Sequence, residues 1–254
     1  PVAASLGPVL AFARMLLWAG DFRAVSWVAV LPGVLAVVLL VFGVHEAAAP
    51  APAGQRTNPI SRAALRRLPR AYWWVVGIGA VFTLARFSEA FLVLRAQQVG
   101  IAIAHVPLVM AVMSLVYAAC AYPFGRLADR VSHTGLLAAG LAVLIAADLV
   151  LAGAQGWSGI LAGVALWGVH MGMTQGLLAA MVADTAPADL RGTAYGAFNL
   201  VSGVALLVAS TLAGWLWQAW GPAASFHAGA GFCVLALMAL SYRHRLVRRS
   251  SAPS

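Results

Sequence analysis

The chain contains few charged residues and no lysine. Only 9% of its 254 residues are charged, whereas soluble globular domains carry about 25%. Hydrophobic residues make up 63% of the sequence. This composition disfavours a soluble fold and predicts a protein whose helices lie in a bilayer.

Sequence signatures of several enzyme classes are also missing. The chain has no G-x-x-x-x-G-K-[ST] phosphate loop, no H-E-x-x-H zinc motif and no G-x-S-x-G nucleophile turn. Its two cysteines, Cys120 and Cys233, lie inside apolar segments, where buried thiols are expected. We therefore expect no ATP-driven transport, no enzymatic activity, no metal site and no cofactor.

Eight apolar segments follow one another along the chain. A helix needs about 20 apolar residues to cross a bilayer. The first segment is shorter than this, and the chain begins with Pro1 inside it. We therefore expect that an N-terminal part is missing. The segments run over residues 1–19, 24–44, 71–94, 104–124, 134–153, 158–182, 193–217 and 224–242.

The longest connection between these segments covers residues 45–70. It is rich in proline and alanine at first and basic at its end. Ser61 can cap a short amphipathic turn that carries Arg62, Arg66 and Arg67. We interpret the connection as a cytoplasmic linker between two helical bundles.

The sixteen basic residues, all arginine, are distributed unevenly along the chain. If the linker is cytoplasmic and the spans alternate, twelve arginines lie on that side, and only Arg14, Arg23 and Arg95 lie on the other. The positive-inside rule then predicts a cytoplasmic C-terminus in the cell (inner) membrane. Because the arginines lie between apolar spans, we expect lipid and not nucleic acid as their partner. The cytoplasmic set comprises Arg56, Arg62, Arg66, Arg67, Arg70, Arg126, Arg130, Arg191, Arg243, Arg245, Arg248 and Arg249.

A faint internal repeat relates the two ends of the chain. The pattern L-W followed by A-x-S-W-x-A at residues 17–29 returns as L-W and A-x-S-F-x-A at residues 216–228. A chance match in a biased composition is the alternative. Taken as a true repeat, it makes six helices one repeating unit, the plan of a class of secondary transporters.

A charged loop follows the segment 104–124 directly. Its sequence, Gly125-Arg126-Leu127-Ala128-Asp129-Arg130, resembles the loop motif G-x-L-A-D-R-x-G-R-R/K of the major facilitator superfamily. Gly125 lets the helix end turn tightly, and Asp129 can lie against the positive end of a neighbouring helix. The resemblance implies a cytoplasmic gate held by Gly125, Arg126, Asp129 and Arg130. An ordinary charged turn is the alternative.

Two further stretches resemble the same family. The sequence Ala3-x-x-x-Gly7-Pro8 is similar to a degenerate form of the fifth-helix motif of antiporters. Residues 183–199 resemble the loop that leads into the eleventh helix. The resemblance implies an all-α polytopic bundle that corresponds to helices five to twelve of a twelve-helix transporter. We divide the chain into two helices of an N-terminal bundle, a linker, a six-helix bundle and a basic tail, at residues 1–44, 45–70, 71–242 and 243–254.

Two ionisable residues lie inside the segment 71–94. Arg86 and Glu89 are three residues apart, which places them on one face of a helix. A lone charge in the middle of a bilayer costs at least about 2.5–3.5 kcal/mol, so it needs a partner or a water-filled cavity. By the resemblance, this helix is the seventh and lines the central cavity. We expect a substrate or proton site in which Glu89 titrates; a structural ion pair near the outer surface is the alternative.

The segment 158–182, the tenth helix by the resemblance, is a second candidate. Its G-x-x-x-G-x-x-x-G stripe at residues 168–176 favours close contact with another helix. Trp167, His170 and Thr174 lie opposite this stripe, whereas Gln175 lies on it. If the glycines pack on a neighbour, the three opposite residues face the pathway, and His170 takes part in proton coupling. A hydrogen-bonded interior histidine is the alternative.

Other polar residues within the spans are weaker candidates. For Asp148, in the ninth helix by the resemblance, we expect a packing or rim role. Tyr195, Asn199 and Ser202 are polar residues in an apolar setting. They either form hydrogen bonds across helices or contact substrate.

These features predict a secondary transporter that works by alternating access. We expect proton-coupled efflux of a small organic, drug-like solute by a protein that is a monomer at full length. A non-transporting sensor or scaffold with the same fold is the alternative. An intramembrane enzyme would need paired catalytic residues at one depth, for which Glu89 and His170 are the only candidates.

Overall fold

The computed structural model describes residues 30, 33–34, 37–39, 41–42 and 62–250. Several sequence predictions therefore lie outside the described residues. They are the Gly7–Pro8 motif, most of the two helices expected within 1–44, the capping Ser61, most of the linker and the last four residues of the tail.

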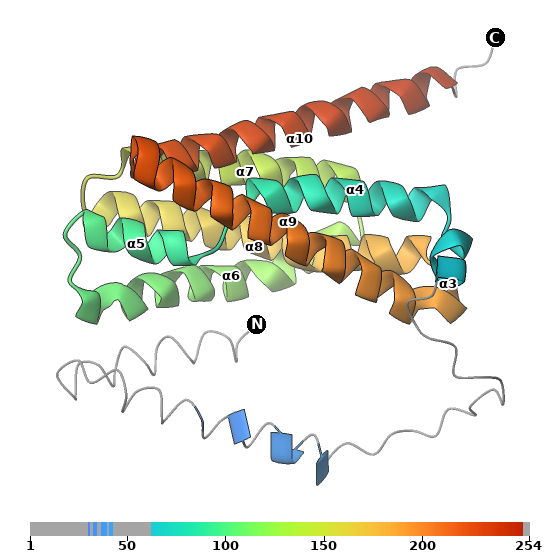
Figure 1. Ribbon diagram of the computed structural model, residues 1–254, viewed down its shortest axis with the longest axis horizontal. Helices are drawn as coiled ribbons and strands as arrows, with labels where there is room; N and C mark the ends of the chain where they lie inside the picture. Colours follow the sequence, from blue (N-terminus) through green and yellow to red (C-terminus); the bar gives the residue numbers. More distant parts are fainter. Residues whose placement is uncertain (1–29, 31–32, 35–36, 40, 43–61, 251–254) are drawn as a thin grey trace.

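The residues from 62 onward form a bundle of helices, and the described parts of the chain contain no strand (Figure 1). Among the described residues, six helical segments are long and apolar enough to cross a membrane, which confirms the six spans predicted after residue 70. The elements are α3 (Arg62–Arg67), α4 (Arg70–Ala85), α5 (Ala90–Gln98), η1 (Ile103–His105), α6 (Val106–Ala128), α7 (His133–Gly153), α8 (Trp157–Thr185), η2 (Ala188–Leu190), α9 (Arg191–Trp220) and α10 (Pro222–Ser250).

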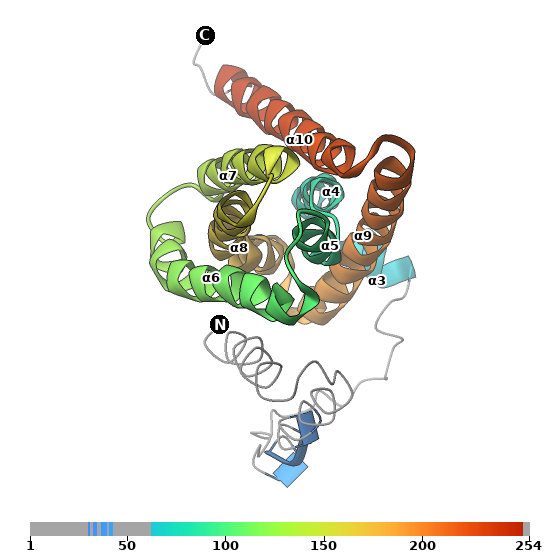
Figure 2. The ribbon, with the colours of Figure 1, turned by 90° about the vertical axis from the view of Figure 1, so that its left-hand side faces the viewer.

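The spans are arranged around α4 and α5. Viewed from the end, α4 and α5 lie near the middle, with α7 and α8 on one side and α9 on the other (Figure 2). Helix α8 packs against α6 and α7, whereas α10 packs against α7, α4 and α9. The buried side chains between these helices are almost all apolar, as the hydrophobic segments require.

Local signals end the helices where the sequence supplies them. The Ser132 side chain caps α7, since its Oγ accepts a hydrogen bond of 3.2 Å from the backbone N–H of Gly135. Gly221 has a φ of +88°, which an L side chain rarely adopts, and it lets α9 turn at once into α10.

The glycine stripe of α8 makes the close helix contact that the sequence predicts. A Cβ on Gly168 would lie 2.5 Å from the carbonyl oxygen of Met113 on α6, and one on Gly172 would lie 2.6 Å from the Cβ of Cys120. Gly176 faces open space. Two of the three glycines therefore allow α6 and α8 to approach each other at backbone distance.

The span that begins at Arg70 is broken, so the prediction of one continuous helix over 71–94 is wrong. Helix α4 ends at Ala85 and α5 begins at Ala90, with Arg86–Glu89 unwound between them. The backbone N–H of Ser88 donates a hydrogen bond of 3.2 Å to Ser210 Oγ of α9. Phe87 turns into the core, with its ring centroid 5.7 Å from that of Trp167 and 5.4 Å from that of Phe226. These contacts compensate for the helical hydrogen bonds that are lost.

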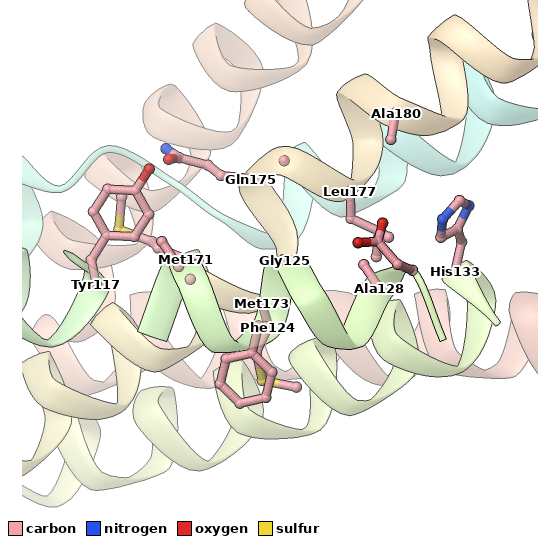
Figure 3. Close-up of a pocket in the computed structure, with 14 residues that line it drawn as sticks. Tyr117, Phe124, Gly125, Ala128, His133, Met171, Met173, Gln175, Leu177 and Ala180 are labelled. Carbon is pink, nitrogen blue, oxygen red and sulfur yellow. The ribbon is translucent and has the colours of Figure 1, made fainter. Parts of the chain in front are cut away.

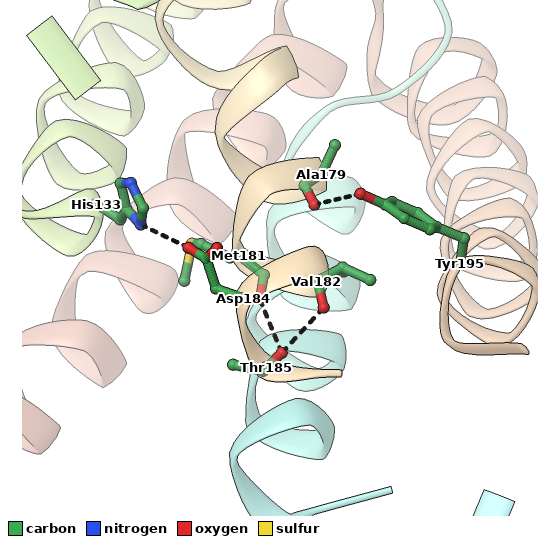
Figure 4. Close-up of polar contacts among 7 residues, drawn as sticks. All are labelled: His133, Ala179, Met181, Val182, Asp184, Thr185 and Tyr195. Carbon is green, nitrogen blue, oxygen red and sulfur yellow. Dashed lines mark hydrogen bonds and ion pairs between the residues drawn. The ribbon is translucent and has the colours of Figure 1, made fainter. Parts of the chain in front are cut away.

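One end of the bundle gathers short loops and arginines, and we call it the basic end. Arg67 of α3 forms an ion pair of 2.8 Å with Asp189 of η2. His133 Nδ1 at the start of α7 lies 3.9 Å from an oxygen of Asp184 near the end of α8 (Figure 4). Arg95 is at the opposite end, where it contacts the C-terminus of α7.

Candidate functional site

The break between α4 and α5 brings ionisable residues into the interior of the bundle. Arg86 is half-buried in the unwound segment, and Glu89 is the N-cap residue of α5. The prediction that both lie on one helical face is wrong, because the segment that joins them is not helical. No ion pair joins them within the described part of the chain. Glu89 and Tyr117 of α6 are the electrostatic neighbours of Arg86, which also acts on His170 of α8.

The polar residues opposite the glycine stripe are buried between helices. Trp167, His170 and Thr174 have 0% of their surface exposed. His170 Nδ1 lies 2.9 Å from the Gly140 carbonyl oxygen of α7, and its ring stacks on Phe82 of α4 at 5.3 Å. The prediction that these three residues face an open pathway is therefore corrected: α4 and α7 cover this side of α8. The alternative prediction for His170, a hydrogen-bonded interior histidine, is the one that the geometry matches.

A cavity of about 340 Å³ lies on the other side of α8, between α8 and α6 (Figure 3). Gly172 and Gly176 line it, and Gln175, Tyr117 and Asp129 supply polar groups. The sequence places Gln175 on the glycine stripe and predicts that this stripe is a helix contact. The structure shows that Gly172, Gln175 and Gly176 of the stripe also line the cavity. The full lining is Tyr117, Ala121, Phe124, Gly125, Ala128, Asp129, His133, Met171, Gly172, Met173, Gln175, Gly176, Leu177 and Ala180.

The loop motif lies at the basic end of this cavity. Helix α6 continues through Gly125 to Ala128, so the prediction that Gly125 turns the helix end is wrong. A Cβ on Gly125 would meet nothing within 4 Å, and the residue lines the cavity instead. Arg126 lies over the Tyr122 ring, with its guanidinium carbon 5.5 Å from the ring centroid. Asp129 and Arg130 are exposed, and neither forms an ion pair with another described residue.

The polar residues of α9 lie in different environments, some in helix contacts and one exposed. Tyr195 Oη donates a hydrogen bond of 2.9 Å to the Ala179 carbonyl oxygen of α8, so it bonds across helices (Figure 4). Asn199 is exposed one turn further along. The Ser202 hydroxyl is buried without a hydrogen-bond partner among the described residues.

Asp148 is fully buried in the contact of α7 with α10. A Cβ on Gly229 of α10 would lie 2.7 Å from Asp148 Oδ2 and 3.1 Å from the Phe87 ring. Neither carboxyl oxygen of Asp148 has a hydrogen-bond partner among the described residues. The residue therefore lies in the packing and not at a rim.

The described residues contain no group of three or more His, Cys, Asp or Glu side chains that could hold a metal ion. The bundle holds an unwound segment with two ionisable residues inside one span, and a cavity with polar groups between α6 and α8. Discontinuous spans with ionisable residues are a recurrent construction of solute pathways in membranes.

Comparison with known proteins agrees with this architecture. The model of the Major Facilitator Superfamily matches residues 90–254. An uncharacterized MFS-type transporter of Methanocaldococcus jannaschii is 30% identical over 222 residues, which cover 85% of this chain and 54% of that protein. An uncharacterized protein of Mycobacterium tuberculosis is 27% identical over 223 residues, with the same coverage of 85% and 54%. The chain thus spans about half the length of the curated relatives it matches. With six membrane-length helices and a family match over most of its length, the chain belongs to the major facilitator superfamily of membrane transporters.

Proposed function

We propose that this chain forms the six-helix C-terminal half, and part of the N-terminal half, of a proton-coupled secondary transporter. The observation that carries the proposal is the unwound segment Arg86–Glu89, which holds a cation and a carboxyl group inside a span. Ionisable residues within spans face cavities or partners, and broken helices expose backbone groups where solutes bind. The solute would be a small organic molecule, bound between two bundles that open in turn.

Glu89 is our candidate for the proton carrier. It is half-buried at the N-cap of α5 and forms no side-chain cap hydrogen bond, so its carboxyl group is not committed to holding the helix end. It also lies three residues from Arg86, at the end of the same unwound segment. A group that exchanges protons while remaining within a span is what coupling to a proton gradient needs.

The orientation, direction and assembly of the transporter belong to the same proposal. The arginines of the basic end favour a cytoplasmic position for that end, with the C-terminus on the same side. The antiporter-like sequence at Gly7–Pro8 favours efflux. At full length, we expect a monomer in the cell membrane, in contact with lipid.

The test is flux through the full-length protein in proteoliposomes. Glu89→Gln should abolish solute movement driven by an imposed pH gradient while leaving expression and the thermal melting temperature unchanged. Asp189→Asn is the matched control, because it removes an exposed carboxyl group at the basic end. Undiminished proton-driven flux in the Glu89→Gln variant would remove Glu89 from the mechanism.

The same assay separates transport from sensing. A sensor or scaffold with this fold would bind its ligand but would move no solute under any gradient. Arg86 lies in an unwound segment inside a span. An ionisable residue at such a position favours a transporter over a scaffold that binds its partners at the surface.

A further inference from the structure

Within the described residues, Arg86 is an interior arginine whose guanidinium has neither a hydrogen-bond partner nor an ion-pair partner. Arg95 donates three hydrogen bonds of 2.8–2.9 Å to the carbonyl oxygens of Leu151, Ala152 and Ala154, and a fourth to Gln98. Arg86, by contrast, has no side-chain hydrogen bond and no ion pair within the described part of the chain. It is nevertheless half-buried within a span.

The surroundings of Arg86 favour a negative group and do not supply one at contact distance. Glu89 is close enough to act electrostatically but forms no ion pair with it. Helix α5 begins four residues after Arg86, so the positive N-terminal end of its dipole adds to the positive charge of this segment. A buried guanidinium is stabilised by an oxyanion that can accept two parallel hydrogen bonds.

We propose that Arg86 binds the transported solute through a carboxylate or an equivalent oxyanion, so that the substrate is a small organic anion. This inference rests on the proposed transport function and names its substrate class. One guanidinium is available at the break, so the site fits a single anionic group.

The cavity between α6 and α8 fits the remainder of such a solute. Arg86 is not among the lining residues, but Tyr117, which is, acts on the charge of Arg86. Apolar side chains, including Met171 and Leu177, make up most of the lining, and Gln175 adds an amide. At about 340 Å³, the volume is at the lower end of the range for small-molecule sites, about 300–1,000 Å³. The anion therefore carries a small apolar or aromatic body.

Glu89 lies in the same unwound segment as Arg86. Its negative charge competes with the solute for the field of Arg86, so removing that charge favours binding of the anion.

The experiment measures ligand-induced thermal stabilisation of the purified full-length protein. The probes are benzoate, benzylamine and benzamide, which share a ring and differ in charge, with 2-naphthoate as a larger carboxylate. Binding to the native state raises the melting temperature, so each titration yields an apparent affinity. The variants are Arg86→Gln, Arg86→Lys and Glu89→Gln, with Arg67→Gln as the control because Arg67 is an exposed arginine at the basic end.

We expect the carboxylates to stabilise the wild-type and Arg67→Gln proteins, and the amine and amide to stabilise neither. Arg86→Gln should weaken carboxylate binding at least about tenfold, the scale of a lost charged hydrogen bond, and Arg86→Lys should retain part of it. Equal stabilisation by benzylamine or benzamide would overturn the proposal. So would a full carboxylate response in Arg86→Gln, or no response to either carboxylate in the wild type. Arg86→Lys keeps the test decisive if Arg86→Gln fails to fold.

The Glu89→Gln variant separates this inference from the proposed function. It should bind benzoate at least as tightly as the wild type, because the substitution removes a negative charge near Arg86. Proton-driven flux should be lost in the same variant. Retained benzoate binding with undiminished flux would refute the role of Glu89 in coupling and leave the anion site standing. Lost proton-driven flux in this variant, with no preference for carboxylates in the wild type, would support the role of Glu89 in coupling and refute the anion site.

Discussion

Replacing Gly168 by alanine should force α6 and α8 apart. The added Cβ would lie 2.5 Å from the Met113 carbonyl oxygen and 3.1 Å from both the Tyr117 backbone nitrogen and the Val116 Cβ. Two of these three atoms belong to the backbone of α6, so no side-chain rotation relieves the contact. Restoring an ordinary contact of 3.4 Å requires a shift of about 0.9 Å between the two helices.

Two opposing effects decide how much Gly168→Ala changes the stability of the protein. Overpacking of this kind costs about 1–3 kcal/mol, whereas alanine in place of glycine favours a helix by about 0.5–1 kcal/mol. Gly176→Ala supplies the matched control, since it lies two turns further along the same stripe with nothing within 4 Å of its Cβ. The control gains the helix preference without the clash. The free energies of unfolding of the two variants should therefore differ by about 2 kcal/mol, with Gly168→Ala the less stable.

The assay is the apparent melting temperature of the two variants in one detergent at a fixed scan rate, because unfolding of a membrane protein is under kinetic control. For a chain of this size, about 2 kcal/mol corresponds to a gap of about 4–8 °C. Equal melting temperatures for Gly168→Ala and Gly176→Ala would refute the close approach of α6 and α8.

Two arginines that make very different contacts should respond differently to substitution. Arg95→Gln removes the hydrogen bonds that hold α5 to the carbonyl groups at the C-terminal end of α7. It should destabilise the protein by about 1.5–3 kcal/mol. A melting temperature within error of the wild type would contradict this role of Arg95. Arg67→Ala removes an ion pair whose side chains are 65% and 58% exposed, and it should cost less than about 1 kcal/mol. A large loss of stability on Arg67→Ala, measured in the same melts, would show that α3 is held to the bundle by more than this pair.

Features that depend on the bilayer alone were predictable from the sequence. A span needs about 20 apolar residues with its backbone satisfied internally, so the apolar segments after residue 70 had to be helices. The contact surface of α8 was also predictable, because glycines four residues apart on a helix always form one smooth stripe.

The sequence did not predict which side of α8 is buried by other helices and which side borders a cavity. This helix is apolar nearly all round, so its sequence does not show which side is covered. The packing of α4 and α7 buries His170, and the open space lies beside Gln175 and Gly176 on the stripe itself. Gly125 likewise lies within α6, although glycine often ends a helix.

The sequence by itself thus determined that the chain crosses a bilayer as helices and where its charges interrupt the apolar spans. Only the tertiary structure decided that the first of the six described spans breaks at Arg86. The sequence around Arg86 has the composition of a continuous helix. The groups that stabilise the break, Ser210 on α9 and the aromatic side chains of Trp167 and Phe226, come from helices far along the chain. Local propensity cannot report contacts that form only after the bundle has assembled, and these contacts place Arg86 and Glu89 inside it.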